Sequence, residues 1–211
     1  MEKGVDAENV LLMNEDLDNI DKWIKFLDPE NLKGNLMFSS LYIATYESFK
    51  EYIIETVKYF YHKGWNDGKD IFSRDYDTRV LSKSKYPVMA SLLWLKELEA
   101  IDEADIDLFG ELREYRNKLS HQLMELLFEG LPKELPKKFS ELIALRIQIE
   151  KWWALNIDIP TNPDLDLEAE INEESIVTHT QIFSKLIFDI ILEDEKKAKY
   201  YQDELKKHFN R

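Results

Sequence analysis

Cysteine is missing from all 211 residues of the chain. Its absence excludes disulfides, zinc–thiolate sites, iron–sulfur clusters and cysteine nucleophiles. It is compatible with a reducing compartment, and we expect a cytoplasmic protein. The opening residues also lack the basic start and long apolar core of a signal peptide. No window approaches the roughly 18 uncharged apolar residues of a membrane span, so we expect no contact with the membrane interior.

Positive charge is scarce as well. The chain has 28 Lys and Arg against 42 Asp and Glu, a formal net charge of -14. Partners such as duplex nucleic acid or an anionic membrane need clustered cations, so this balance argues against a large electrostatic footprint for them. A small phosphate-binding pocket needs only two or three cations and is not excluded.

Several catalytic and metal motifs are absent. The sequence has no glycine-rich phosphate loop, no His-Glu-x-x-His, no Gly-x-Ser-x-Gly and no regular spacing of metal ligands. Residues 156–174 hold seven acidic residues without a lysine or arginine, but lack the glycine and ligand spacing of a calcium loop. We interpret them as a solvated linker, and we expect neither a metal nor a cofactor.

Most of the sequence has the apolar periodicity of α-helices. With 44% hydrophobic and 12% aromatic residues, the chain can build a sizeable core. Apolar residues recur every three or four positions in six segments, and no stretch has a convincing strand pattern. These segments are Ala7–Leu27, Leu36–His62, Pro87–Ala100, a central helix over about 106–129, Lys137–Leu155 and Ser175–Phe209. The pattern predicts an all-α antiparallel bundle of five to six helices.

Turn signals separate these segments. Asp28-Pro29 ends the first helix, residues 31–35 form a short turn with a glycine, and Gly130 with Pro132 closes the central helix. We expect a bundle core over 1–155, the acidic linker over 156–174 and a C-terminal helix over 175–211. Residues 64–84 read as a long loop. Its Arg74 and Arg79 either bind phosphate or pair with neighbouring aspartates.

The segment Leu36–His62 has an unusually aromatic stripe. Aromatic residues at helical spacing usually pack in a core, which is our interpretation here. A small-molecule-binding bundle is an alternative that rests on these aromatic residues alone. The stripe consists of Tyr42, Tyr46, Phe49, Ile53, Val57 and Phe60, with Glu47, Glu51 and Glu55 turned away from it.

The central helix combines an arginine, an amide and a histidine. Its apolar stripe is Leu108, Leu112, Tyr115, Leu119, Leu123 and Leu126. At 100° per residue, Arg116 lies about 40° from Leu112, inside that stripe, and His121 lies about 180° from Leu112, beside Asn117. Arg116 and His121 are thus about 140° apart in a straight helix. Either the helix is distorted there, or a second copy of the chain completes the site.

An arginine within an apolar stripe needs a partner, because an unpaired buried charge is costly. A ligand phosphate is one candidate. Carboxylates on other segments are the alternative, namely Glu47, Glu51 or Glu97.

Arg116-Asn117-x-x-x-His121 on the fourth helix of a small bundle resembles the R-x4-6-H motif of the HEPN superfamily. The resemblance implies an all-α bundle that dimerises to bring two such motifs together. Many members are metal-independent endoribonucleases of toxin–antitoxin, phage-defence or RNA-processing systems. By this resemblance Arg116 binds the scissile phosphate, His121 is the general acid/base for attack by the ribose 2′-hydroxyl, and Asn117 orients the site.

The expected enzyme is a HEPN-like endoribonuclease acting as a homodimer, with RNA as substrate and a cognate antitoxin or regulatory protein as a further partner. Nearby polar residues that we expect to contact substrate are Arg113, Lys118 and Ser120. The alternative is a non-catalytic helical module that binds another protein, an inactive HEPN-like or antitoxin-like chain. In that case Arg116 belongs to a structural ion pair.

Overall fold

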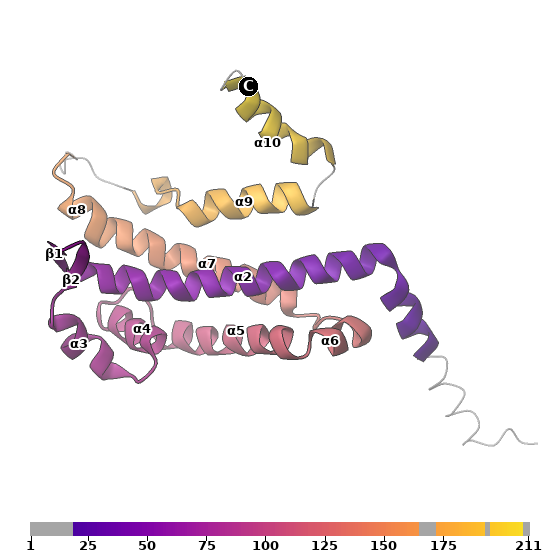
Figure 1. Ribbon diagram of the computed structural model, residues 1–211, viewed down its shortest axis with the longest axis horizontal. Coiled ribbons are helices and arrows are strands. Elements are labelled where there is room, and N and C mark those ends of the chain that lie inside the picture. The colour runs from indigo at the N-terminus through magenta and orange to yellow at the C-terminus, as the bar shows by residue number, and fades with distance from the viewer. Residues whose placement is uncertain (1–18, 165–171, 193–194, 209–211) are drawn as a thin grey trace, which may run out of the picture. The chain divides into compact units, whose positions relative to one another are not determined.

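The chain is mostly helical, with one small two-stranded sheet in the part that is described (Figure 1). The computed structural model describes residues 19–164, 172–192 and 195–208. It divides into two compact units. Of the described residues, the first comprises 19–93 and 104–142, and the second comprises 94–103 and those from 143 onward. Helices α4 and α7 contribute residues to both units. Our division at 155 and 174 follows composition and stays a prediction.

The first unit begins with helical residues 19–27. Its remaining elements are α2 (Pro29–Phe60), β1 (His62–Asn66), β2 (Lys69–Phe72), α3 (Asp75–Arg79), the 3₁₀ helix η1 (Leu81–Lys83), the start of α4 (Pro87–Glu97), α5 (Glu103–His121), α6 (Leu123–Glu129) and the start of α7 (Leu135–Trp153).

The second unit takes the last residues of α4 and the rest of α7. It continues through the π-helical turn η2 (Ala154–Asp158), α8 (Ile159–Thr161), the 3₁₀ helix η3 (Glu173–Ser175), α9 (His179–Leu192) and α10 (Glu195–His208). The acidic linker predicted over 156–174 therefore contains short helical turns at both of its described ends, and residues 165–171 lie outside the described residues.

Helix α2 begins earlier than the sequence predicts. The break at Asp28-Pro29 is confirmed, but the predicted turn over residues 31–35 is wrong, because these residues are helical. The Asp28 carboxylate accepts a hydrogen bond from the Glu30 N–H at 3.1 Å, and Pro29 has its φ preset for the first helical position. This start signal outweighs the propensity cost of about 1 kcal/mol for Gly34 inside the helix.

The stripe of α2 forms the centre of the first unit. Five residues of the stripe are buried as predicted, whereas Phe60, at the last turn, is 46% exposed. The buried five are Tyr42, Tyr46, Phe49, Ile53 and Val57. The Phe109 ring of α5 contacts Tyr46 and Phe49 at centroid distances of 5.4 and 6.0 Å. Figure 1 shows α5 running antiparallel beside α2. The aromatic residues are therefore core, which removes the observation behind the small-molecule interpretation.

The predicted loop over 64–84 contains the sheet, so our expectation of no strand is wrong. Strands β1 and β2 pair antiparallel, with Asn66 opposite Lys69. Asp67 and Gly68, the two residues between the strands, have φ values of 50° and 75°. This backbone suits a two-residue hairpin turn, which Asp-Gly strongly favours. Helices α3 and η1 follow the hairpin, so little of the segment is irregular.

Helix α9 begins at His179 rather than at Ser175, because a capping box fixes its start. The Thr178 Oγ1 accepts from the Gln181 N–H at 3.2 Å, and the Gln181 Oε1 accepts from the Thr178 N–H at 2.8 Å. The predicted single C-terminal helix is two helices, α9 and α10. Helix α4 likewise ends at Glu97, and the backbone turns at Glu99, whose φ is 58°.

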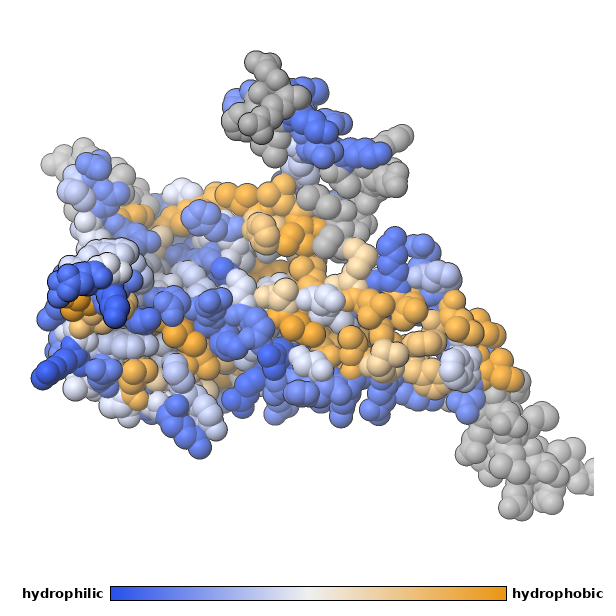
Figure 2. Space-filling model, in the orientation of Figure 1, coloured by the Kyte–Doolittle hydropathy of each residue, from blue (hydrophilic) through white to orange (hydrophobic). Residues whose placement is uncertain are grey.

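Hydrophobic residues gather on one face of the first unit, over helical residues 19–27 and the beginning of α2 (Figure 2). The large exposed side chains there are Ile20, Trp23, Ile24, Leu27, Leu36 and Met37, and Met124 of α6 is 67% exposed. No helix within the described ranges is both long enough and apolar enough to cross a membrane.

Candidate functional site

Helix α5 carries the Arg116–His121 segment and ends there. Its core-facing side chains are Ile106, Phe109, Leu112 and Leu119. The central helix predicted over 106–129 is interrupted at Gln122, which has φ -124° and ψ 20° and precedes the separate helix α6. The C-terminal end at Gly130, with φ 102°, agrees with the prediction. The helix distortion therefore follows His121 rather than lying between Arg116 and His121.

Arg116 is held against α2 by a carboxylate. Its Nη2 contacts the Glu47 Oε1 atom, and the two side chains are 29% and 33% exposed. Its Nη1 donates a hydrogen bond to the Asn117 Oδ1 atom at 3.1 Å. The buried Nε has no hydrogen-bond partner among the described residues. Of the three carboxylates considered as partners, Glu47 is confirmed, and the guanidinium keeps one unused donor.

Glu47 is shared between two cations. Lys50, one turn later on α2, also contacts its carboxylate. Burial raises the pKa of Glu47, but the hydrogen bond and charge of Lys50 together with those of Arg116 outweigh it and hold the pKa below its ordinary value. Glu47 is therefore a carboxylate at neutral pH. Lys50 was not singled out from the sequence, although a glutamate and lysine three residues apart on a helix are a recognisable pair.

Tyr46, the residue before Glu47, is a buried neighbour of this group. It is 2% exposed, and burial raises its pKa to about 12 despite the nearby charges of Arg113 and Arg116. The phenol is therefore neutral at physiological pH. Its ring packs on Phe109 in the core, next to the charges of Glu47 and Arg116.

The remaining predicted site residues lie on the outer side of α5. Asn117 is half-buried, whereas Arg113, Lys118, Ser120 and His121 are exposed. The Lys118 Nζ lies 5.5 Å from the centroid of the Tyr115 ring. The exposed position of His121 agrees with its predicted placement off the apolar stripe. Within one copy of the chain, Arg116 is hydrogen-bonded to Asn117 but does not contact His121.

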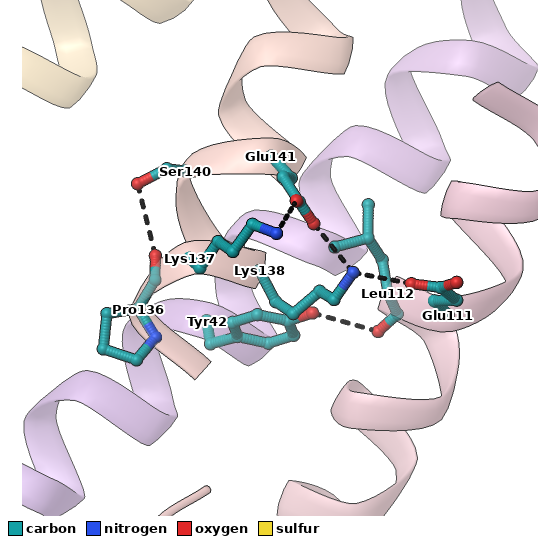
Figure 3. A network of polar contacts seen from close by, with 8 residues as sticks. All are labelled: Tyr42, Glu111, Leu112, Pro136, Lys137, Lys138, Ser140 and Glu141. Carbon is teal, nitrogen blue, oxygen red and sulfur yellow. Dashed lines mark hydrogen bonds and ion pairs between the residues drawn. The ribbon is translucent and has the colours of Figure 1, made fainter. Parts of the chain in front are cut away.

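A second polar network fixes the middle of α5 (Figure 3). The Tyr42 hydroxyl donates to the Leu112 carbonyl oxygen at 3.1 Å. On the beginning of α7, the Lys138 Nζ lies 2.6 Å from the Glu111 Oε2 and 2.8 Å from the Glu141 Oε2. The hydrogen bonds that Lys138 donates to Glu111 and Glu141 raise its pKa. These contacts set the position and rotation of α5 one turn before Arg116.

The arrangement offers a fixed, partly exposed cation, an amide and an exposed imidazole. Together these groups can bind an anion and transfer a proton, provided that a second surface supplies what one chain does not bring together. Within the described residues, no group of three or more His, Asp or Glu side chains is placed to hold a metal ion. The metal-free reaction stays a prediction.

Comparison with known proteins gives no relative. No protein-family model, no curated protein and no solved structure matches this chain.

Proposed function

We propose that this chain is a HEPN-like, metal-independent endoribonuclease that acts as a homodimer. The observation that supports it most is the state of Arg116. It is held by Glu47 and Asn117 on a helix that ends at His121, and its side chain is still 29% exposed. A guanidinium that is fixed in place and partly open to solvent is suited to receive phosphate oxygens.

The proposed reaction is an internal transfer within RNA. The ribose 2′-oxygen attacks the adjacent phosphorus, a bond forms between them, and the bond from phosphorus to the 5′-oxygen of the next nucleotide breaks. His121 accepts the proton of the 2′-hydroxyl and returns a proton to the leaving 5′-oxygen. Arg116 stabilises the charge that grows on the phosphorane, and Asn117 holds Arg116. The products are a 2′,3′-cyclic phosphate and a 5′-hydroxyl, and no redox change occurs.

The geometry of α5 is the reason for proposing a dimer. Side chains about 140° apart on one helix do not converge on one phosphate. In a two-fold dimer with these helices near the axis, Arg116 of one protomer faces His121 of the other. Met124, three residues after His121, is 67% exposed and continues into the hydrophobic surface of the first unit. Such a surface suits a protein–protein interface.

A non-catalytic interaction module is the second candidate, and one observation favours it. Arg116 already has a carboxylate partner, as a structural arginine would. In that case the polar residues of α5 have no role beyond solubility. A cognate antitoxin or regulatory protein fits both proposals.

The test is incubation of the purified protein with mixed RNA in EDTA, followed by analysis of the cleaved ends. We expect cleavage with 2′,3′-cyclic phosphates, and we expect His121→Ala to abolish it. No cleavage, cleavage that EDTA stops, or cleavage that His121→Ala leaves intact would favour the interaction module.

A further inference from the structure

The hairpin end of the first unit has a composition unlike the rest of the chain. Over residues 58–86 positive charge exceeds negative charge by three, in a protein whose net charge is -14. The cations are Lys58, Lys63, Lys69, Arg74, Arg79, Lys83 and Lys85, and the anions are Asp67, Asp70, Asp75 and Asp77. In Figure 2 the hairpin end of this unit is mainly hydrophilic. This segment is the exception to the acidic balance.

Four of these cations are exposed and unpaired. Lys63 and Lys69 lie on the two strands, and Arg74 and Arg79 border α3. None of the four side chains forms an ion pair or hydrogen bond with another described residue. The prediction that the arginines pair with neighbouring aspartates is therefore wrong. Two of the aspartates have other partners, because Asp70 contacts His62 at 2.9 Å and Asp75 accepts from the Ser73 hydroxyl at 3.1 Å.

Aromatic rings lie among these cations. The Tyr59 ring at the end of α2 stacks on the His62 ring at a centroid distance of 5.0 Å and an interplanar angle of 20°. His62 also contacts Phe72 on the paired strand at 5.6 Å. The Lys58 Nζ lies 4.9 Å from the centroid of the Phe72 ring. This cluster attaches the hairpin to α2, which a two-stranded sheet needs because it is marginal alone.

Trp65 is not needed for that attachment. It is 68% exposed, and its ring only reaches the His62 ring at a centroid distance of 6.3 Å, close to perpendicular. Tyr59 and Tyr86 are also more than half exposed, at 52% and 57%. The register, with Trp65 opposite Asp70 and Asn66 opposite Lys69, places Trp65 and Lys69 on opposite faces of the two-stranded sheet. Large exposed rings and unpaired cations on one segment are the combination that single-stranded nucleic acids use, with bases stacking on the rings and phosphates meeting the cations.

We infer that the hairpin surface, defined here as both faces of the hairpin with its neighbouring exposed residues, binds single-stranded nucleic acid. Its residues are Lys63, Trp65, Lys69, Arg74 and Arg79 with Tyr59 and Tyr86. A duplex is disfavoured because its stacked bases leave no free faces for these rings. An acidic peptide would use the cations but not the tryptophan. The inference rests on the hairpin residues and not on Arg116 or His121, so it goes beyond the proposed cleavage. If both proposals hold, the hairpin surface binds the RNA that the Arg116–His121 site cleaves. Stacking does not distinguish RNA from DNA.

The experiment measures binding in the full-length His121→Ala protein, so that cleavage cannot confuse the result. Fluorescein-labelled single strands of twelve uridines or twelve thymidines, a duplex of equal length and polyglutamate are titrated by fluorescence anisotropy in EDTA. We expect both single strands to bind more tightly than the duplex, and polyglutamate not to bind. Binding of the uridine strand alone would also support the inference and identify RNA as the ligand.

Two variants and their matched controls locate the surface. Trp65→Ala should weaken binding by about 5- to 100-fold, the usual loss for one stacked base. Phe183→Ala, which removes a ring that is 65% exposed on α9, should leave binding unchanged. Lys63→Gln with Lys69→Gln should reduce the slope of log affinity against log salt by about 1.4, at about 0.7 per phosphate contact. Lys33→Gln with Lys133→Gln, also exposed, should not change this slope.

Several outcomes would overturn the inference. They are no binding at low salt, equal or tighter binding of the duplex or of polyglutamate, and equal loss in the control variants. Circular dichroism of each variant verifies folding. Because Trp65 is 68% exposed, Trp65→Ala should not unfold the protein, so a loss of binding reports on the ring itself. Failure here leaves cleavage at Arg116 and His121 open, and failure of cleavage leaves this binding open.

Discussion

The two units each contain a glutamate in contact with an arginine, and the two pairs differ in how completely they are satisfied. In the second unit, Glu150 is 10% exposed, and its Oε1 accepts from the Arg146 Nε at 2.9 Å and from the Thr180 hydroxyl at 2.6 Å. Its Oε2 accepts from the Thr180 N–H at 3.2 Å. The two bonds from Thr180 attach α9 to α7, and the Arg146 bond, within α7, holds the Glu150 carboxylate.

The pair in the first unit is more exposed and less complete. Glu47 and Arg116 are 33% and 29% exposed, and the Arg116 Nε has no hydrogen-bond partner among the described residues. Exposed polar residues of α5 surround it, whereas the Glu150 pair has a helix end bound to it. A buried pair that only supports the fold is expected to use all its donors and acceptors. Glu150 thus has the contacts of a structural residue, whereas Arg116 keeps the partial exposure that its proposed role requires.

The largest expected effect is the loss of RNA cleavage in His121→Ala, without a loss of stability. His121→Ala should lower the rate of RNA cleavage by about two to four orders of magnitude, as loss of a general acid/base commonly does. Its free energy of unfolding should change by less than about 0.5 kcal/mol, because the side chain is exposed. Cleavage rates and urea unfolding measure both. His179→Ala, an exposed histidine at the start of α9, is the control.

Glu150→Ala should lower the stability of the protein and leave RNA cleavage unchanged. We expect the free energy of unfolding to fall by about 2–4 kcal/mol, because Arg146 and the Thr180 N–H lose a buried acceptor. Cleavage per folded molecule should remain that of the wild type. Urea unfolding at pH 7 gives the stability. A loss below about 1 kcal/mol would show that the pair does not hold α9.

Glu47→Gln should produce a smaller loss that depends on pH. Removing the charge should cost about 1–2 kcal/mol, since the pair is partly exposed. The pKa of Glu47 is lowered from 4.5, so its stabilisation is complete above that pH and is lost as the pH falls through the lower folded value. The difference between wild type and variant should be constant from about pH 5 to 8 and shrink below about 4.5. Unfolding series at several pH values test this, and a difference that grows in acid would contradict it.

The smallest effect concerns the start of α9, next to the Glu150 pair. Thr178→Ala removes a capping side chain and should cost about 1 kcal/mol. Hydrogen exchange should become faster in the first turn of α9 and remain unchanged in α5. Ser175→Ala, three residues before the cap and exposed, should have no such effect.

Local signals predicted several features of this fold. Asp28-Pro29 and Gly130 mark the helix ends where they were expected, and the stripe from Tyr42 to Val57 is buried. Placing Arg116 within an apolar stripe led to Glu47 as one of three possible partners. These predictions succeed because capping geometry and helical period are set within a few residues.

The errors have two physical causes. In two segments glycine was interpreted as a sign of irregular structure although another local signal was present. Asp67-Gly68 is a hairpin turn between two strands, and Gly34 lies inside α2, whose start is set by Asp28-Pro29. The capping box of Thr178 and Gln181 was also readable from sequence. The break at Gln122 has no local proline or glycine, so helical period alone could not place it. Which of the three candidate carboxylates contacts Arg116 depends on how α5 packs on α2, which spacing does not give.

The most direct test of the central claim uses two inactive variants together. Arg116→Ala and His121→Ala are co-expressed with different tags, the mixed dimer is purified through both tags, and light scattering verifies its mass. If Arg116 of one protomer acts with His121 of the other, one of two sites is intact, and the mixed dimer should regain roughly half of the wild-type rate. Each variant alone should be inactive. A monomeric wild type, a wild type that does not cleave RNA, or a mixed dimer as inactive as its parents would contradict the account.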